Sequence, residues 1–301
     1  MFIVNDKMVS EDKSDDLRWY LLQNKIHEAR IREAFQLFRA NGIEPILIKG
    51  WAIARLYPES RLRAYTDIDL GVSSEDIEKA RALLENEDAK KLNIDLHNEF
   101  RHLDSVEWPV LFRDSKPVTI DGVDIRILSP EDHLRVLCVH WLTDSGSDKE
   151  RLWDIYYAVQ NVPGGFDWDK CLGRVSETRK RWIICTIGLA KKYLGVDIDG
   201  LPFSIEASDL PRWLTQSIER EWKLGVPLRG LYDSLHDWRF FARQVRKRVP
   251  PNPLYSTIEC EGEFDDRSRA PYQLRSLLRR VVPGIRRIAI TLRAGSRKNS
   301  E

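Results

Sequence analysis

The sequence predicts an α+β fold, with a small mixed sheet and helices over residues 1–128 and an α-helical domain over 129–248. An irregular segment and a basic tail follow over 249–301. Up to residue 128, short β-rich runs alternate with helical patterns, whereas longer segments with helical periodicity follow from Ser129 onward. Ser129 is a helix-capping residue followed by Pro130 and two acids, a typical helix start that marks the boundary.

In chain order, the first predicted elements are a helical stretch, a strand followed by a helix, and a second strand followed by a helix. The stretch SDDLRWYLLQNKIHEARIREAFQLFRANG carries apolar residues largely at helical spacing and predicts one long helix or two, with Gly42 as a stop. The run EPILIKG predicts a strand that ends at Gly50, and a helical pattern follows from Trp51 to Tyr57. DIDLGV predicts the second strand, and IEKARALLEN predicts a helix after two serines that can cap it.

Two further strand signals complete the first part. NIDLHNEF partly alternates apolar and polar residues and predicts a third strand, and VTIDGVDIRIL predicts a hairpin that turns at Asp121 and Gly122. Beyond Ser129, helices are predicted in RLWDIYYAVQNV, WDKCLGRVSETRKRWIICTIGLAKKYLG and LPRWLTQSIEREWKLG. Most of the ten tryptophans are expected in the core, and a few are expected to line an acceptor pocket.

Composition restricts the class of partner. The 48 basic and 47 acidic residues give a formal charge of +1, so no overall field favours nucleic acid or an anionic membrane. No window approaches eighteen uncharged apolar residues, and the N-terminus lacks the basic and apolar stretches of a signal peptide. Four cysteines without CxxC spacing indicate reduced thiols. We therefore expect a cytoplasmic protein without a transmembrane segment.

The C-terminal tail is locally basic, because eight lysines and arginines between 275 and 298 meet a single acid at Glu301. Such a tail could bind RNA, a membrane face or an acidic partner. Alternatively, its leucines, valines and isoleucines pack as a helix while the arginines stay in solvent. The sequence leaves these alternatives open.

Asp67 and Asp69 stand one residue apart in an apolar run. On a strand, side chains at i and i+2 point from the same face, and two carboxylates roughly 6 to 7 Å apart at Cα repel each other. Cations between them remove the repulsion, and Mg²⁺ prefers such hard oxygen ligands together with nucleotide phosphates. The alternative is a solvated strand end whose aspartates pair with Arg61 or Arg63.

Three further features extend the predicted site. Gly50 lies between a strand and a helix, where backbone N–H groups can hold phosphate oxygens. Lys49 and Arg63 could add positive charge there. Asp95, on the next strand, could reach the same metals, and three carboxylates on two strands suggest two Mg²⁺ ions. His97 shares a face with Asp95, but a bond to a neighbour is the simpler interpretation and it stays outside the catalytic set.

This order of a strand, a glycine turn, a helix, a DxD strand and a later acidic strand resembles the DNA polymerase β-like nucleotidyltransferase superfamily. The local pattern is similar to the bacterial family labelled uncharacterised nucleotidyltransferase, over about residues 43–168. It consists of Lys49-Gly50, Arg63 four residues before the DxD, DIDL at 67–70 and IDLH at 94–97. The resemblance implies a polymerase β-like catalytic domain followed by a helical one.

The resemblance also implies roles for individual residues. Asp67 and Asp69 would bind both metals, Asp95 would bind the catalytic metal and favour deprotonation of an acceptor hydroxyl, and Gly50 would face the triphosphate. Trp51 follows Gly50, where many superfamily members have serine or a second glycine. Lys49 or Arg63 would replace that phosphate contact.

The predicted function is therefore Mg²⁺-dependent transfer of a nucleoside monophosphate from a nucleoside triphosphate, such as ATP, to a hydroxyl acceptor, with release of pyrophosphate. The near-neutral charge favours a small molecule or a protein as acceptor over nucleic acid. The alternative is a non-catalytic module of the same fold that senses nucleotide or binds a partner. The sequence leaves open the preferred nucleotide, the acceptor and the oligomeric state.

Overall fold

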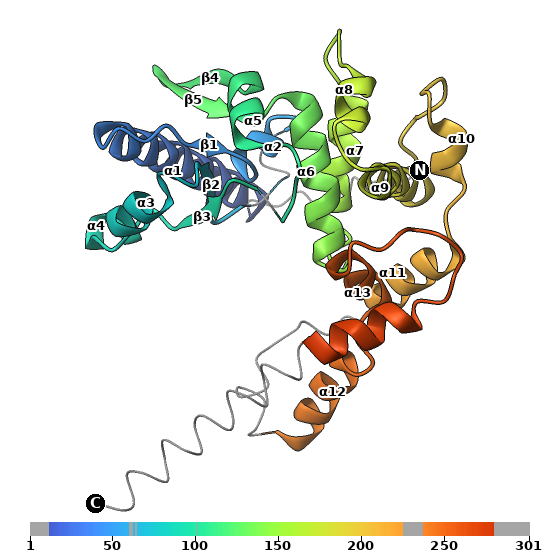
Figure 1. The fold of residues 1–301 in the computed structure, drawn as a ribbon. Coiled ribbons are helices and arrows are strands. Elements are labelled where there is room, and N and C mark those ends of the chain that lie inside the picture. The colour runs from blue at the N-terminus through green and yellow to red at the C-terminus, as the bar shows by residue number, and fades with distance from the viewer. Residues whose placement is uncertain (1–11, 60–62, 64, 101, 225–236, 280–301) are drawn as a thin grey trace, which may run out of the picture. The chain divides into compact units, whose positions relative to one another are not determined.

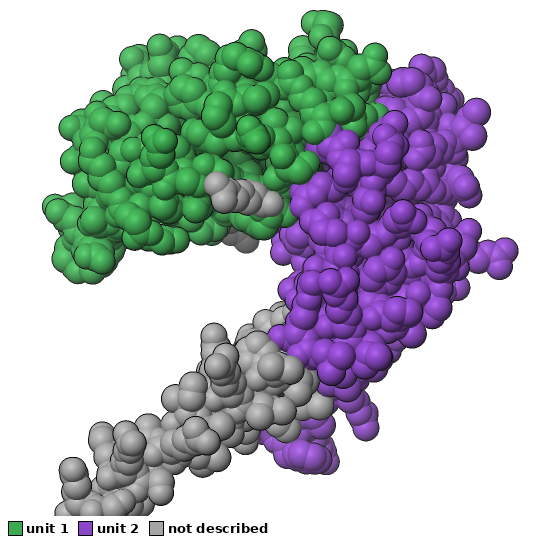
Figure 2. Space-filling model, viewed as in Figure 1, with its two compact units in different colours: residues 1–137, 157–174 green, residues 138–156, 175–301 purple. Residues whose placement is uncertain are grey.

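The computed structural model describes residues 12–59, 63, 65–100, 102–224 and 237–279. Figure 2 shows two compact units, the first made of residues 1–137 and 157–174 and the second of residues 138–156 and 175–301. The basic tail beyond residue 279 lies outside the described residues. The limits of a catalytic domain at 1–128 and a helical domain at 129–248 stay predictions.

Five strands of the first unit form one mixed sheet in the order β3-β2-β1-β5-β4 (Figure 1). The strands are β1 (Ile46–Leu47), β2 (Ile68–Val72), β3 (Ile94–Asn98), β4 (Lys116–Ile120) and β5 (Val123–Ile127). The pairs β2–β3 and β1–β5 are parallel, and the pairs β1–β2 and β4–β5 are antiparallel. The fold class predicted from the sequence, a mixed sheet followed by a largely helical region, is confirmed.

The predicted hairpin joins β4 to β5. Asp121 and Gly122 both have positive φ, 42° and 83°, as a two-residue turn that matches the strand twist requires. Thr119 donates a 2.7 Å hydrogen bond to Asp124 across the hairpin, next to the turn. The turn chemistry visible in the sequence therefore fixes this register.

One face of the sheet is covered by α1 (Asp12–Ala40), a single helix where the sequence left one or two open. Ile31, Phe35 and Phe38 recur at helical spacing and are almost fully buried against Leu70 and Ile125 of the strands, among others. The chain leaves α1 through Gly42, whose φ of 71° suits a helix stop. This packing seals the side of β2 opposite to Asp69.

The other face carries a second apolar cluster. Ile46 and Ile48 alternate with the buried Leu47 of the first cluster, and they pack with Phe100, Trp108 and Leu111. Trp108 begins helix α5 (Trp108–Asp114), which the sequence did not predict, because seven residues give too little periodicity to recognise. Asp69 lies on this side of the sheet, at the edge of the cluster.

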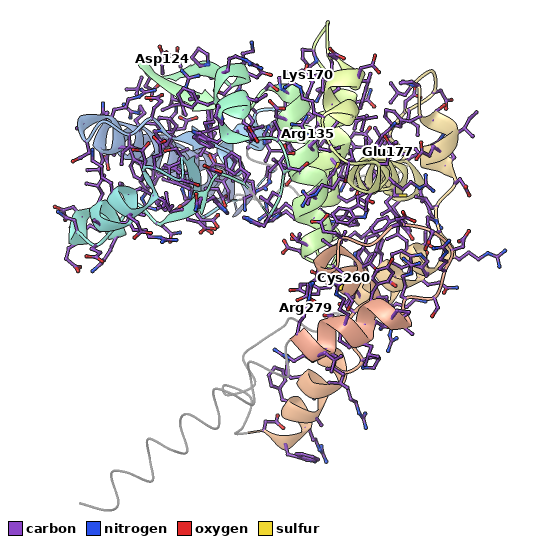
Figure 3. The ribbon with its side chains drawn as sticks, in the orientation of Figure 1. Asp124, Arg135, Lys170, Glu177, Cys260 and Arg279 are labelled. Carbon is purple, nitrogen blue, oxygen red and sulfur yellow. The ribbon has the colours of Figure 1, made fainter. Side chains whose placement is uncertain are left out.

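Helix α6 (Pro130–Thr143) begins as predicted, with Ser129 accepting a 3.3 Å hydrogen bond from the backbone N–H of Asp132. Arg135, labelled on α6 in Figure 3, is about 1% exposed and binds the buried carboxylates of Asp104 and Asp132. Its bonds to Asp104 are 2.9 and 3.1 Å long. This buried triad ties the loop before α5 to the first turns of α6.

Short helices fill the rest of the first unit. The predicted helix from Trp51 ends early, because bonds from Leu56 to Ile53 and from Tyr57 to Ala54 tighten the chain into turns. The remaining helices that lie wholly or partly in this unit are α2 (Trp51–Ala54), α3 (Ile77–Leu84), α4 (Glu87–Lys90), α7 (Leu152–Gln160) and α8 (Trp168–Gly173).

The second unit is helical. Its helices include α9 (Glu177–Leu194), α10 (Ser204–Ser208), α11 (Arg212–Leu224), α12 (Trp238–Arg248) and α13 (Pro253–Glu259). The periodic segment 168–195 forms two helices, because Ser176 caps α9 by accepting a bond from the N–H of Arg179. Gly195 ends α9 at a φ of 75°. Trp182 is fully buried, as expected of a core tryptophan.

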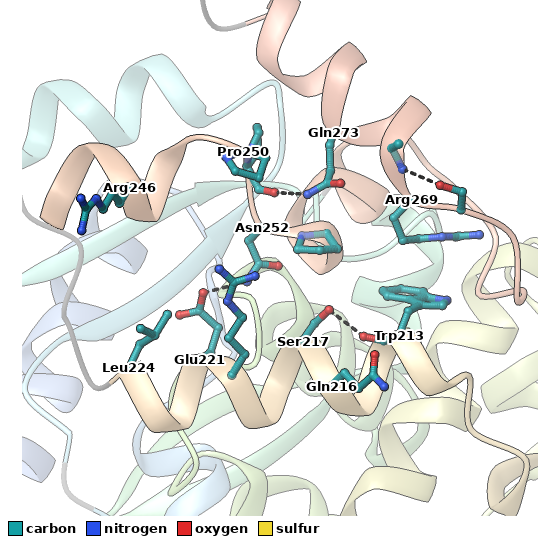
Figure 4. A pocket seen from close by; sticks show the side chains of 15 residues that line it. Trp213, Gln216, Ser217, Glu221, Leu224, Arg246, Pro250, Asn252, Arg269 and Gln273 are labelled. Carbon is teal, nitrogen blue, oxygen red and sulfur yellow. Dashed lines mark hydrogen bonds between the residues drawn. The ribbon is translucent and has the colours of Figure 1, made fainter. Parts of the chain in front are cut away.

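A cavity of about 440 Å³ lies within the second unit (Figure 4). Trp213 forms part of its wall, together with prolines at 250, 251 and 253. Its polar groups bind one another, since Asn252 donates to Glu221 and Gln273 donates to the carbonyl of Pro251. Arg220 and Arg246 also line the cavity, so it combines an aromatic and proline wall with basic side chains.

Gly188→Ala is expected to destabilise the protein by about 1 to 3 kcal/mol, because an added methyl overpacks a tight contact. A Cβ at this position of α9 would lie 1.9 Å from the carbonyl oxygen of Ala207 in α10. Thermal unfolding followed by circular dichroism measures the change. Gly173→Ala is the matched control, since its Cβ would meet nothing within 4 Å. Equal unfolding midpoints for the two variants would contradict this packing.

All four cysteines are free, and burial raises the pKa of Cys171 and Cys185 to about 12. Such thiols are poor nucleophiles at neutral pH. Among the described residues, no helix has both the length and the apolar composition needed to cross a membrane.

Candidate active site

The pairing of β2 with β3 brings the acidic residues together. In this parallel pair Asp69 lies beside Asp95, and Gly71 lies beside His97. Neighbours in register point to the same face, and residues two apart along a strand share it. The three side chains of Asp69, Asp95 and His97 therefore emerge on one face, opposite to the face that α1 covers.

Their donor atoms converge. One ligand atom from each of Asp69, Asp95 and His97 lies within 4.8 Å of the other two. The His97 Nε2 atom is 3.2 Å from Asp69 Oδ1 and 3.3 Å from Asp95 Oδ2. Asp69 is buried at 3% exposure, whereas the side chain of Asp95 is 58% exposed. The group thus has a fixed inner carboxylate and an outer one that reaches solvent.

Lys49 also contacts this group. Its Nζ atom is 2.6 Å from Asp69 Oδ1, and both side chains are largely buried. Burial raises the pKa of Asp69, but the hydrogen bond from His97 and the charge of Lys49 outweigh it, so the pKa of that carboxyl lies below its ordinary value. Asp69 is therefore an ionised carboxylate that already binds a cation.

Gly50 carries the chain from β1 into α2. Its φ of 55° with ψ of −114° is a conformation that residues with a Cβ rarely adopt, so glycine is required here. A Cβ on Gly50 would meet the carbonyl oxygen of Asp67 and the ring of Tyr65, each at 3.5 Å. The turn that contains Lys49 and Gly50 thus lies directly against the segment that leads into β2.

Asp67 does not belong to the converging group of donor atoms. Asp67 is exposed and precedes the first residue of β2, and it is not one of the three described residues whose donor atoms gather within 4.8 Å. Arg63 is 7% exposed. Burial raises the pKa of Tyr65 above its usual value, and the charge of Arg63 opposes that shift, which places Arg63 near this phenol. Their roles in metal and phosphate binding stay predictions.

His97 is the functional candidate that sequence reasoning set aside. Its spacing from Asp95 did indicate a shared face, but its contact with Asp69 depends on the register of a parallel pair, which the sequence does not display. The ring stacks on His102, with centroids 5.7 Å apart and planes 18° apart. The structure thus adds an imidazole to Asp69 and Asp95, two of the three predicted carboxylates.

The donor set suits a divalent cation. Two carboxylates balance its charge, and a carboxylate and an imidazole each provide a good ligand atom. The Lys49 ammonium held at Asp69 supports this interpretation, because it shows that the position attracts a positive charge. A metal bound here would compete with Lys49 for the same carboxylate oxygen.

The family described as uncharacterised nucleotidyltransferase matches residues 7–195, which is more than half of the chain. No curated protein and no solved structure matched the chain. The matched region contains the whole sheet, the Lys49-Gly50 turn and the Asp69, Asp95 and His97 group. The chain therefore belongs to this family and is a nucleotidyltransferase.

Proposed function

We propose that the site transfers a nucleoside monophosphate from a nucleoside triphosphate to a hydroxyl group, with two divalent cations and release of pyrophosphate. The observation that carries the proposal is the register of β2 and β3, which sets Asp69 beside Asp95 with His97 two residues further on. Carboxylates on neighbouring strands can hold metals close enough to activate a hydroxyl and stabilise a leaving group. Mg²⁺ is the ion that the sequence predicts.

Each residue has a proposed task. Asp69 and Asp95 would hold one cation, and Asp67 would contribute to a second. Asp95, the more exposed carboxylate, faces the side from which an acceptor can enter, and it orients the acceptor hydroxyl. When bound, the metals supply positive charge that stabilises the phosphoryl oxygens and lowers the pKa of the attacking hydroxyl.

Lys49 and Gly50 act on the triphosphate. Gly50 allows the backbone to approach the phosphates closely, since it has no side chain in the turn before α2. Lys49, which pairs with Asp69 in the structure, would be free to contact a phosphate oxygen if a metal took its place at that carboxylate. Arg63 is the second candidate for this contact. The domain that carries these residues is proposed to span 1–128, with a helical domain after it.

The acceptor is proposed to be a small molecule or a protein, and the reaction is proposed to take place in the cytoplasm. The balanced charge of +1 supports the first point, because nucleic-acid binding relies on excess positive charge. The four free cysteines support the second, since reduced thiols are typical of the cytosol.

Lys49→Met is expected to weaken nucleotide binding by about tenfold to a hundredfold, because it removes a charged hydrogen bond worth about 1.5 to 3 kcal/mol. Isothermal titration with a non-hydrolysable nucleoside triphosphate measures the change. Lys90→Met is the matched control, since Lys90 makes an ion pair of equal length, 2.6 Å, with the exposed Glu87 of α4. Unchanged nucleotide affinity in the Lys49 variant would remove Lys49 from the phosphate site.

The proposed transfer is tested by mass spectrometry. The protein is incubated with Mg²⁺ or Mn²⁺, each of the four nucleoside triphosphates and a cell extract, and metabolites, proteins and RNA are searched for nucleotide-sized mass gains. The Asp67→Asn/Asp69→Asn variant is the control. Mass gains that are absent from this double variant support the proposal and identify the acceptor class. Nucleotide binding without any transfer would instead favour the non-catalytic sensing or partner-binding module.

A further inference from the structure

One nitrogen of His97 faces two carboxylates at once. Its Nε2 atom is 3.2 Å from Asp69 Oδ1 and 3.3 Å from Asp95 Oδ2. A ring nitrogen presents either one proton or one lone pair, so it can satisfy only one of these oxygens well. A cation shared by the nitrogen and both oxygens satisfies all three atoms. The three atoms are therefore placed to share one cation, which would replace the hydrogen bond between His97 and Asp69.

The imidazole is held in this orientation. The side chain of His97 is 10% exposed, and it lies between the stacked ring of His102 and the tilted ring of Phe100, with the Phe100 centroid 6.5 Å away. Phe100 itself packs over Gly71, where an added Cβ would lie 2.0 Å from a ring carbon. Ligands locked by such packing bind a metal with little loss of side-chain freedom.

The donor types select among metals. Mg²⁺ strongly favours oxygen ligands and water, whereas an imidazole nitrogen suits first-row transition ions. Mn²⁺ shares the preference of Mg²⁺ for carboxylates and also gains from a nitrogen ligand. Two carboxylates and one imidazole therefore suit Mn²⁺ better than Mg²⁺, and phosphate oxygens and water can complete its coordination.

We propose that His97 is a metal ligand and that it gives the position between Asp69, Asp95 and His97 a preference for Mn²⁺ over Mg²⁺. This inference rests on the proposed function, because it concerns the metal of that same site. The second cation, to which Asp67 is proposed to contribute, keeps the predicted preference for Mg²⁺.

The test measures metal binding without nucleotide or turnover. Mn²⁺ is titrated into the full chain, and free Mn²⁺ is followed by electron paramagnetic resonance, with Mg²⁺ affinity obtained by competition. Wild type is expected to bind Mn²⁺ at least about tenfold more tightly than Mg²⁺. His97→Ala is expected to lose at least about tenfold in Mn²⁺ affinity and much less in Mg²⁺ affinity. Pulsed measurements should detect a nitrogen coupled to bound Mn²⁺ in wild type but not in His97→Ala.

Three variants make the result specific. His97→Asp gives the site three carboxylates. It is expected to reduce the preference for Mn²⁺ over Mg²⁺ while the site still binds a metal. His102→Ala removes the stacked ring and should keep the nitrogen coupling. His140→Ala tests a surface histidine that lies 3.6 Å from Asp144, and it should change nothing. Circular dichroism checks that each variant is folded, and His97→Asn replaces His97→Ala if the latter does not fold.

Equal losses of Mn²⁺ and Mg²⁺ affinity in the His97 variant, or no nitrogen coupling in wild type, would overturn the inference and leave His97 as a residue that only positions Asp69. The proposed function would survive that result, provided that transfer still depends on Asp69. Conversely, nitrogen-coupled Mn²⁺ in a protein that transfers no nucleotide would support the metal site and contradict the proposed function.

Discussion

Asp69→Asn is expected to reduce nucleotidyl transfer by at least about a thousandfold, because it removes the charge of the innermost carboxylate that is proposed to bind metal. Asparagine has the same shape and can still accept hydrogen bonds from Lys49 and His97, which lie 2.6 and 3.2 Å from Asp69 Oδ1. The fold should therefore persist while the metal is lost. Pyrophosphate release measures the rate, and Mn²⁺ titration measures the metal.

The control for this variant is Asp88→Asn, which removes an exposed carboxylate of α4 that pairs with Lys91 at 2.7 Å. Its rate should stay within about twofold of wild type, as expected for a surface ion pair. Asp95→Asn should lose less metal affinity than Asp69→Asn, because water can replace the more exposed ligand. A variant at Asp69 that keeps a tenth of the wild-type rate would contradict the role assigned to this carboxylate.

Arg135→Met is expected to lower the free energy of unfolding by about 3 to 5 kcal/mol, because it leaves two buried carboxylates without their cation. Asp104 and Asp132 have side chains that are 0% exposed, and both bind the Arg135 guanidinium. Two carbonyl oxygens of α8, from Lys170 and Cys171, accept further bonds of 3.4 Å from it. Denaturation by urea measures the loss.

Two variants isolate the cause of that loss. Arg81→Met removes an exposed arginine that pairs with Glu78 in α3, and it should cost less than about 1 kcal/mol. Adding Asp104→Asn to the Arg135 variant removes one of the two buried carboxylates that lack a cation. It should recover part of the lost stability. If the Arg135 and Arg81 variants unfolded at the same urea concentration, the buried triad would contribute no more to stability than an exposed ion pair.

The sequence predicts most elements of the sheet because their signals are local. The Asp121-Gly122 turn, the capping serine before α6 and the apolar runs around Leu47 and Leu70 each depend on a few neighbouring residues. Short helices such as α5 and the early end of α2 escape prediction, because tertiary packing rather than periodicity decides them.

The site is predictable in part for a similar reason. Asp69 and Asp95 stand out as charges within apolar strands, and the structure does place them side by side. The contacts of His97 and Lys49 with Asp69 arise from strand pairing between distant segments, which no local pattern encodes. Asp67 shares the DxD pattern with Asp69, yet β2 begins only at Ile68, so the strand spacing does not by itself determine its position.

Following the α- and γ-phosphates of the nucleotide separately shows whether the site transfers a nucleoside monophosphate. Wild type and Asp69→Asn are incubated with a nucleoside triphosphate labelled at the α-phosphate or at the γ-phosphate, with the acceptor class identified by mass spectrometry. The proposed nucleotidyl transfer predicts that the α-label enters the acceptor, that the γ-label leaves as pyrophosphate, and that both events require Asp69. Transfer of the γ-label to the acceptor, or α-label transfer that persists in the Asp69 variant, would contradict it.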